Sequence, residues 1–138
     1  MRQYQYYKIG LLVIFAYLQI LLYSNYYMQK YQLGEFEEIV LLTVGILHGN
    51  AYGVTIKDEI EDRLGREVSV GALQVTLRRL EKKGYLKSKH GETEKKRGGR
   101  PKLYFTITAY GKKALAYVRE TRNELWDSLP QTVLKLGY

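Results

Sequence analysis

Cysteine is absent from this sequence of 138 residues, and histidine occurs only twice, as His48 and His90. Without cysteine the chain forms no disulfide bond and offers no thiol nucleophile, cysteine-ligated zinc or iron–sulfur cluster. Two histidines are too few for a histidine-rich metal site, so neither a metal nor a cofactor is expected. Only 2 residues are proline and 26% are charged, which favours a compact, helix-rich domain over a disordered chain.

Acidic side chains are outnumbered by basic ones, 14 against 22, so the formal net charge is +8. The excess is concentrated, because residues 87–102 hold 7 basic and 2 acidic side chains and therefore carry +5. Residues 32–138 as a whole also sum to +5, so the rest of that region is neutral. A positive field confined to one short segment favours a polyanionic partner, either nucleic acid or an anionic membrane surface.

The first 31 residues contain no acidic side chain and hold 8 of the 14 tyrosines. Within them, residues 9–22 form an apolar run that is interrupted only by Gly10 and Gln19. These 14 residues are fewer than the roughly 20 that a helix needs to span a bilayer. A signal peptide fits poorly, because no small-x-small cleavage site follows Leu22 before the tyrosines.

Three interpretations of residues 1–27 are open. They are a membrane anchor or interfacial helix, a helix packed on the following domain, or an extension ahead of the native start. We favour the third, because the residues from Met28 onward, MQKYQLGEFEE, have the character of the opening of a soluble domain. The expected organisation is this extension, a domain over residues 28–108, and a C-terminal helix and tail over residues 109–138.

Three helices are predicted after the extension. Apolar residues recur at helical spacing over residues 35–48, and three acidic residues in the first turn suit the positive end of the helix dipole. A second helix is predicted over residues 52–64, and a third over residues 70–83, where Ser69 is a good N-cap. The helices are expected to end at glycines, which are Gly49, Gly65 and Gly84.

A hairpin and a last helix follow. Residues 85–90 and 103–107 are predicted strands, the second with alternating apolar and polar side chains. The loop between them, GETEKKRGGRPK at residues 91–102, is basic and contains the glycine pair of the turn. Thr108 can N-cap the last helix, which is predicted over residues 109–129 and stops at a proline.

Three helices followed by a basic hairpin is the element order of a winged helix-turn-helix, a mainly α fold with a small β-hairpin. Its third helix enters the major groove, and its wing lies along the backbone. The outer face of residues 69–83 is small at its N-terminal end and cationic toward its C-terminal end, which suits close approach to DNA. An ordinary solvated helix face and a solvated loop are the alternatives. The residues expected to contact DNA are Ser69, Ala72, Gln74, Val75, Thr76, Arg78, Arg79 and Lys82 on the helix and Lys95, Lys96, Arg97, Arg100 and Lys102 on the wing.

The last predicted helix has apolar residues near heptad spacing, although the first three helices and the hairpin already supply a core. Such a helix favours a partner, and a two-fold dimer with a second copy of the chain is the simplest one. Packing of the helix on its own domain is the alternative. Trp126 is also a candidate site for a small apolar effector, although dimer packing is the commoner role. The expected dimer contacts are Leu115, Val118, Leu125, Trp126 and Leu129.

Four blocks of this sequence together resemble the PadR-type transcriptional regulators: LGEFEEIVLLTVGIL, AYGVTIKDEIE, VSVGALQVTLRRLEKKGYL and RGGRPKLYFTITAYGKKAL. The resemblance covers about residues 30–127. It implies a winged-helix domain with a C-terminal dimerisation helix, acting usually as a repressor. Many members have tyrosine where this chain has Gln74. On the matching positions, Tyr52 and Gly53 open the second helix, Gly71, Ala72 and Leu73 begin the recognition helix, and Gly98, Gly99 and Arg100 form the wing tip.

The leading hypothesis is a cytoplasmic, sequence-specific DNA-binding regulator. It is a homodimeric repressor with residues 69–83 in the major groove of double-stranded DNA and residues 91–102 on the backbone. The alternative is a membrane-anchored regulator or peripheral membrane protein, which requires residues 1–27 in the native chain. Catalysis is not expected, because the sequence has no recognisable nucleophile–base pair, GxxxxGK[ST] loop or metal-ligand cluster.

Overall fold

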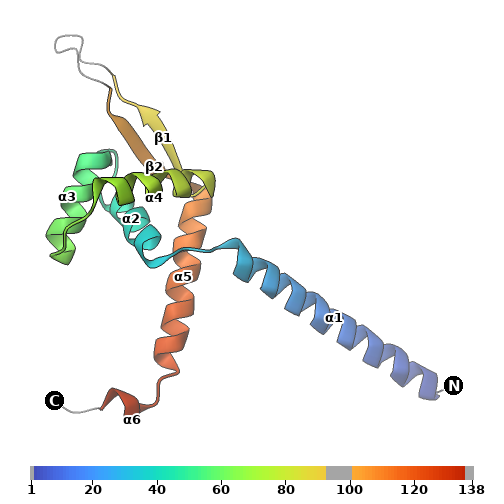
Figure 1. Ribbon diagram of the computed structural model, residues 1–138. Coiled ribbons are helices and arrows are strands. Elements are labelled where there is room, and N and C mark those ends of the chain that lie inside the picture. Colours follow the sequence, from blue (N-terminus) through green and yellow to red (C-terminus); the bar gives the residue numbers. More distant parts are fainter. Residues whose placement is uncertain (1, 93–100, 136–138) are drawn as a thin grey trace. The chain divides into compact units, whose positions relative to one another are not determined.

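The computed structural model of this chain describes residues 2–92 and 101–135, without the side chains of residues 2, 3 and 24–30. The chain falls into two units, Met1–Gln32 and Leu33–Tyr138, and each is described by itself. Helices dominate both units, and the described part of the second contains a two-stranded antiparallel sheet (Figure 1). The predicted fold class, mainly α with a small β-hairpin, is confirmed.

The first unit consists mainly of the helix α1 (Arg2–Lys30). Its residues 4–23 are exposed on every side, and most of them are apolar. The stretch Tyr4–Tyr23 has 20 residues and a mean hydropathy of 1.6, so its length and composition would allow it to cross a membrane. Signal sequences also reach these values, so the three interpretations of residues 1–27 stay predictions.

In the second unit, α2 (Glu35–Ile46), α3 (Gly53–Leu64) and α4 (Val70–Lys82) pack on one another. Each helix turns an apolar stripe inward, because its apolar residues recur three or four positions apart. The same spacing predicted all three helices to within two residues at each end. The fully buried side chains include Val40 and Leu41 from α2, Ile56 and Ile60 from α3, Leu73, Leu77 and Leu80 from α4, and Tyr85 after α4.

Local caps determine where these helices begin and end. The side-chain oxygen of Ser69 accepts a hydrogen bond from the N–H of Ala72 at 3.2 Å, which confirms its predicted N-cap role. Gly65 and Gly84 follow α3 and α4 with φ of 61° and 77°, a backbone region that favours glycine. The helix α2 ends two residues before its predicted boundary, because Leu47 is already the C-cap.

The strands β1 (Leu86–His90) and β2 (Leu103–Ile107) form the antiparallel hairpin, paired along all five residues. The hairpin is attached to the helices through β2, because the N–H of Phe105 donates to the carbonyl of Ala51 at 2.8 Å. Ala51 immediately precedes the N-cap of α3, Tyr52. The base of the hairpin is therefore joined to the start of α3.

The helix α5 (Ala109–Asp127) begins against the core. The side-chain oxygen of Thr108 accepts a hydrogen bond from the N–H of Gly111 at 3.0 Å, which confirms the predicted N-cap. A Cβ atom on Gly111 would collide with the carbonyl oxygen of Tyr85, so this contact requires glycine. Ala114 is fully buried one turn later. The first half of α5 thus packs on its own domain.

The second half of α5 extends away from the core (Figure 1). Leu125 and Trp126 are 66% and 63% exposed there. The helix ends at Asp127, two residues before its predicted boundary, and Pro130 is the N-cap of the short helix α6 (Gln131–Leu134). Packing on its own domain is thus observed for the first half of α5, and Arg122 in the second half pairs with Glu38 of α2 at 2.7 Å. The dimer stays a prediction.

Candidate nucleic-acid interface

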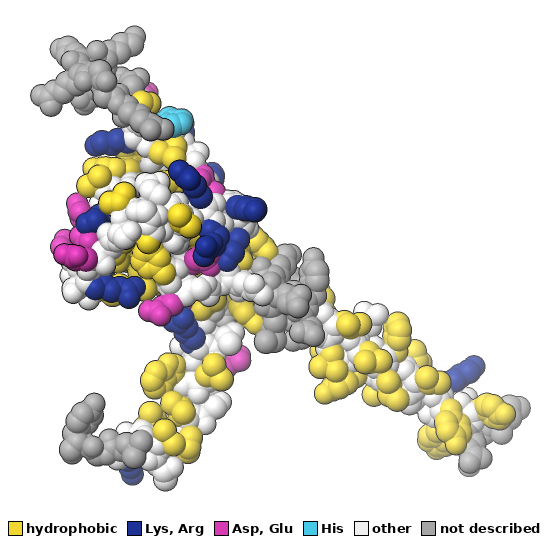
Figure 2. Space-filling view, in the orientation of Figure 1, with side chains coloured by type: hydrophobic (Ala, Val, Ile, Leu, Met, Phe, Trp, Pro, Cys, Tyr) yellow, Lys and Arg dark blue, Asp and Glu magenta, His cyan; other side chains and the backbone are white. Residues whose placement is uncertain are grey.

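The outer face of α4 is exposed along its whole length. Gly71, Val75, Arg78 and Lys82 share this face at spacings of three and four residues, opposite the buried leucines. The face is uncharged in its N-terminal half and cationic in its C-terminal half. Figure 2 shows several Lys and Arg side chains gathered where α4 ends, whereas acidic side chains lie mainly on the side of α3.

Seven of the eight residues predicted to contact DNA from this helix are exposed. The eighth, Thr76, is only 6% exposed, and its hydroxyl donates to the carbonyl of Ala72 at 2.8 Å. Thr76 lies on the flank of α4 next to the buried stripe, so the predicted DNA contact is wrong for this residue. The exposed residues are Ser69, Ala72, Gln74, Val75, Arg78, Arg79 and Lys82.

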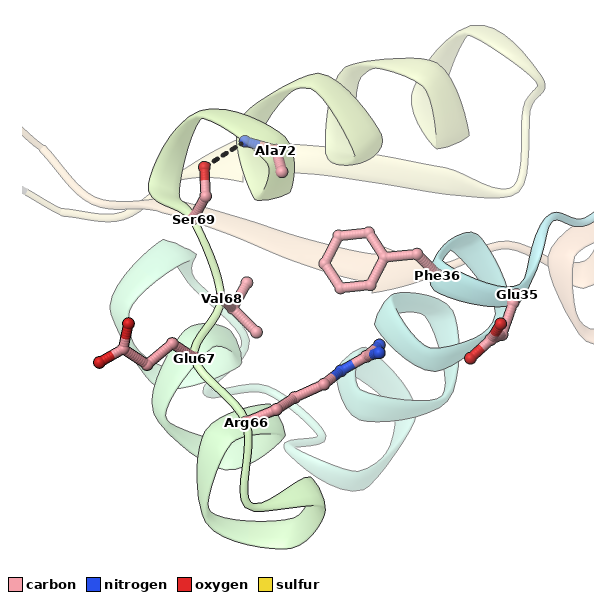
Figure 3. A pocket seen from close by; sticks show the side chains of 7 residues that line it. All are labelled: Glu35, Phe36, Arg66, Glu67, Val68, Ser69 and Ala72. Carbon is pink, nitrogen blue, oxygen red and sulfur yellow. Dashed lines mark hydrogen bonds between the residues drawn. The ribbon is translucent and has the colours of Figure 1, made fainter.

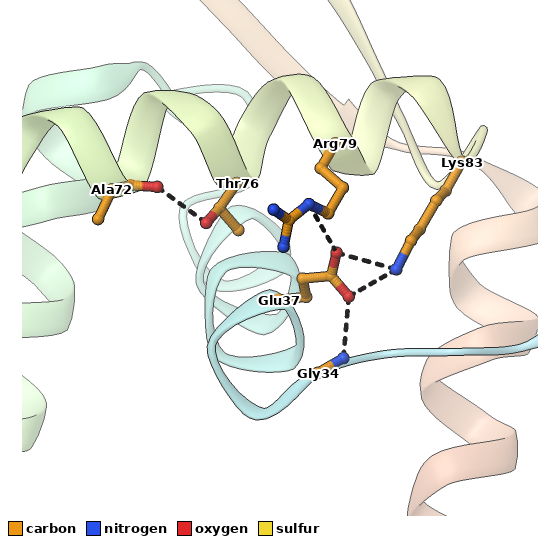
Figure 4. Close-up of polar contacts among 6 residues, drawn as sticks. All are labelled: Gly34, Glu37, Ala72, Thr76, Arg79 and Lys83. Carbon is orange, nitrogen blue, oxygen red and sulfur yellow. Dashed lines mark hydrogen bonds and ion pairs between the residues drawn. The ribbon is translucent and has the colours of Figure 1, made fainter.

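The buried carboxylate of Glu37 holds the C-terminal end of α4 against α2 (Figure 4). The side chain of Glu37 is 6% exposed, and the ammonium group of Lys83 donates to its two oxygens at 2.8 and 2.9 Å. The N–H of Gly34 donates to the same carboxylate at 2.9 Å. The guanidinium of Arg79 lies 4.0 Å away and is mostly exposed. The end of α4 is therefore fixed, while Arg79 faces solvent.

The turn between α3 and α4 is fixed by a second carboxylate, that of Glu61. It accepts hydrogen bonds from the ammonium of Lys57 and from the backbone N–H of Val68, both at 2.7 Å. The hydrogen bond from Lys57, followed by that from Val68, lowers the pKa of Glu61 below its usual value. The carboxylate is therefore charged at neutral pH and keeps both donors. Since Val68 precedes the N-cap of α4, this contact positions the start of that helix.

An open hollow of about 420 Å³ lies beside this turn, between α2 and the start of α4 (Figure 3). The guanidinium of Arg66 crosses the hollow and lies 5.9 Å from the centre of the Phe36 ring. Glu35 and Glu67 stand at its edges. This charged lining suits the anchoring of the turn better than the binding of an apolar molecule.

The loop end of the paired strands packs on the start of α3 through aromatic rings. The rings of Tyr52 and Tyr104 meet edge to face, with their centres 5.5 Å apart. The ammonium of Lys102 lies 4.4 Å from the centre of the Tyr52 ring. A Cβ atom on Gly91 would lie 2.6 Å from the Tyr104 ring, so glycine is needed on that side. These contacts hold the described ends of the basic loop, Gly91 and Lys102, near the start of α3.

Lys102 is exposed and is the wing residue of the predicted set that the structure describes. The ring of Tyr52 holds its ammonium group at the base of the wing. The other four predicted wing residues, Lys95, Lys96, Arg97 and Arg100, lie outside the described residues. Their contact with DNA stays a prediction.

Residues 41–117, more than half of the chain, match the sequence profile described as the transcriptional regulator PadR-like family. The chain belongs to this family.

Solved structures of PadR-like proteins share the fold. The PadR-like transcription factor from Bacteroides fragilis is 24% identical with a TM-score of 0.58, covering 76% of this chain and 93% of its own. A PadR family regulator from Eggerthella lenta DSM 2243 is 24% identical with a TM-score of 0.58, covering 89% and 99%. A PadR family regulator from Clostridium difficile R20291 is 26% identical with a TM-score of 0.52, covering 69% and 97%. No curated protein matches the chain.

The PadR-like family consists of transcriptional regulators, so the resemblance found in the sequence is confirmed. This PadR-like chain is a DNA-binding transcriptional regulator with a winged helix-turn-helix fold, and it is not an enzyme. Within the described residues, no group of three His, Asp or Glu side chains could hold a metal ion.

Two parts of this PadR-like interface were missed by the sequence analysis. Glu37 was predicted only as one of three acids at a helix start, and its contact with Lys83 depends on how α2 and α4 pack. Tyr52 was assigned only to the start of α3, and Tyr104 only to a strand. The edge-to-face contact between them depends on the hairpin folding back. No local pattern in the sequence signals either contact.

Replacing Glu37 by alanine should destabilise the domain. The substitution leaves Lys83 and the N–H of Gly34 without their shared acceptor, and hydrogen bonds to charged groups contribute about 1.5–3 kcal/mol each. We therefore expect the free energy of unfolding, measured by urea denaturation, to fall by about 2 kcal/mol or more. Glu35→Ala is the matched control, because this exposed acid lies in the same helical turn. Equal losses in the two variants would contradict the assigned role of Glu37.

Replacing Tyr52 by alanine should weaken DNA binding by displacing the wing. The substitution removes an aromatic pair and a cation–π contact, together about 1–2 kcal/mol, or roughly 5- to 30-fold in affinity. We expect this loss on any DNA sequence in fluorescence anisotropy titrations. Tyr52→Phe keeps the ring and should bind almost as tightly as the unmodified chain. An equal loss in both variants would assign the effect to the hydroxyl group and refute the ring contact.

Proposed function

We propose that this PadR-like protein is a homodimeric, sequence-specific repressor. In this proposal α4 enters the major groove and the wing, residues 91–102, lies along the DNA backbone. The observation that carries the proposal is the outer face of α4, which is exposed although both ends of the helix are held by buried or bonded carboxylates. A rigid helix with a free outer face suits entry into the major groove.

The charge distribution supports a division of roles in DNA binding. Arg78, Arg79 and Lys82 lie in the C-terminal half of α4 and are exposed, so they can reach phosphates beside the groove. The segment of residues 87–102 holds seven further basic side chains. Phosphate contacts of this kind supply affinity for any sequence, whereas the uncharged half of α4 supplies selectivity.

The apolar surface of α5 supports a dimer. Leu125 and Trp126 are exposed, and together with Arg122 and Leu129 they line an open hollow of about 270 Å³. A second hollow of about 410 Å³ lies between α2 and α5, and Leu42, Leu115 and Ala116 contribute apolar side chains to its lining. Exposed apolar surface along one helix is typical of an interface, and a two-fold dimer is the commonest arrangement. Leu115 and Val118 are half-buried and would extend this interface toward the domain.

A dimer presents two copies of α4 and thus suits two half-sites about one helical turn of DNA apart. Occupation of such a site in a promoter blocks transcription, which agrees with the repressor role that the family resemblance implies. In this proposal the protein acts in the cytoplasm, where it meets its DNA partner. As an alternative, a planar apolar effector would bind the α5 surface at Trp126. Its binding would then change the affinity for DNA through the dimer.

A second candidate function is a membrane-anchored regulator, which the apolar stretch Tyr4–Tyr23 favours. This function requires residues 1–27 in the native protein. Mass spectrometry of the native N-terminus tests it: a peptide from residues 3–8 supports the anchor, and an N-terminus at Met28 eliminates it.

The wing should contribute to affinity without contributing to selectivity. Each lost phosphate contact reduces the slope of log affinity against log salt by about 0.9. Replacing Lys95 and Lys96 together by alanine should therefore reduce the slope by about 2 and weaken binding equally on operator and scrambled DNA. The control is Arg63→Ala, since this side chain pairs with Glu59 on α3. An unchanged slope in the double variant would refute the wing contact.

The dimer should depend on the exposed end of α5. Trp126→Ala combined with Leu125→Glu removes a large apolar side chain and adds a charge, so we expect analytical ultracentrifugation to find a monomer where the unmodified chain is a dimer. Operator affinity should fall at least tenfold, because the two half-sites are then bound separately. Glu120→Ala, on the opposite side of the helix, should leave the dimer intact. A dimer that persists in the double variant would exclude this interface.

A further inference from the structure

The N-terminal half of α4 presents side chains that carry no charge. Between the N-cap and Arg78, the exposed residues of the outer face are small, apolar or an amide. In helix-turn-helix proteins the N-terminal residues of the recognition helix contact base edges. The base pairs in the centre of the half-site therefore meet these side chains, which are Gly71, Ala72, Gln74 and Val75.

Arg79 is badly placed to read guanine, for which arginine is the commonest reader. It lies on the flank toward α2, with its guanidinium 4.0 Å from the carboxylate of Glu37. Arg78 lies on the outer face three residues after Val75, or about 4.5 Å along the helix axis. It meets DNA beyond the uncharged half of α4, where it can reach phosphates.

Gln74 is exposed and rests against the first residue of α3. Its amide nitrogen would lie 3.3 Å from a Cβ atom built on Gly53, so glycine at this position leaves room for the amide. A Cβ atom at position 53 would press on this amide, whereas glycine lets the amide keep its position. A glutamine amide can donate to and accept from adenine through N7 and the N6 amino group.

Val75 is 53% exposed in the centre of the outer face. One turn earlier on the same face is Gly71, which has no side chain to keep the helix away from the DNA. The C5-methyl group of thymine is the apolar group that base pairs display in the major groove. An exposed valine in this position can pack against that methyl group but has no hydrogen-bonding group for other base edges.

We infer that the operator half-site contains two adjacent A·T pairs, with one adenine bound by Gln74 and one thymine methyl packed on Val75. Gly53 is a positioning residue for Gln74. This inference rests on the proposed function, because it assumes that α4 enters the major groove. It adds the identity of the bases that the helix selects.

Selection from randomised duplexes with the full chain tests the inference. The unmodified protein should enrich adjacent A·T pairs in each half-site. Gln74→Ala should lose the preference for adenine at one of them, and Val75→Ala the preference at its neighbour, each by roughly tenfold. Gln131→Ala and Val133→Ala are matched controls, because they change the same residue types in α6, at the far end of α5 from the hairpin (Figure 1).

Modified bases separate the two contacts. Replacing the critical thymine by uracil removes only the methyl group, so it should weaken binding several-fold for the unmodified chain and not for Val75→Ala. Replacing the critical adenine by 7-deazaadenine removes N7 and should weaken binding for the unmodified chain and not for Gln74→Ala. Gly53→Ala should reduce the adenine preference without changing the response to uracil.

Failure of the base assignment and failure of the proposed function give different results. If the unmodified chain enriches a half-site with G·C pairs at these positions, or if Gln74→Ala and Val75→Ala keep its preferences, the base assignment is wrong and the DNA-binding proposal stands. If the unmodified chain enriches no sequence while the controls also bind DNA without preference, sequence-specific regulation and the base assignment both fail.

Discussion

The position of the C-terminal end of α4 depends on one buried carboxylate. Glu37 on α2 and Lys83 after α4 are 46 residues apart in the chain, yet the lysine donates to both carboxylate oxygens. A buried carboxylate without such donors would be costly, so this end of α4 has little freedom to shift. Glu61 restrains the other end through the N–H of Val68. The carboxylates of Glu37 and Glu61 thus restrain the two ends of α4 from the side of the core and leave its outer face exposed.

Contacts at the start of α3 also align the hairpin with α4. Tyr52 belongs to the first turn of α3, and its ring holds both Tyr104 and Lys102 of the hairpin. A Cβ atom on Gly53, the next residue, would lie 3.3 Å from the amide nitrogen of Gln74 on α4. The start of α3 is therefore the point where the wing and the recognition helix meet. In the proposed complex, phosphate contacts from the wing and base contacts from α4 would be made from one frame, which suits a regulator that must keep both in register on DNA.

The sequence was sufficient to predict what local interactions determine. Leu73, Leu77 and Leu80 recur at helical spacing, and Ser69 and Thr108 cap their helices through the next turn. The sequence was not sufficient to predict the contacts that depend on how the helices and the hairpin pack. Thr76 was included among the expected DNA contacts although its angle puts it on the flank of the helix, and it lies beside the buried stripe and is covered. The partners of Glu37 and Tyr52, and the division of α5 into a covered and an exposed half, follow from how the helices and the hairpin meet in space.

The absence of cysteine makes a direct test of the central claim simple, because a single introduced thiol is unique in the chain. The measurement is the rate at which iodoacetamide labels Val75→Cys in the full chain, with and without operator DNA, against Val133→Cys as control. If the outer face of α4 lies in the major groove, operator DNA slows labelling at position 75 at least tenfold and leaves position 133 unchanged. Equal labelling rates at position 75, under conditions in which the variant binds the operator, would contradict the account.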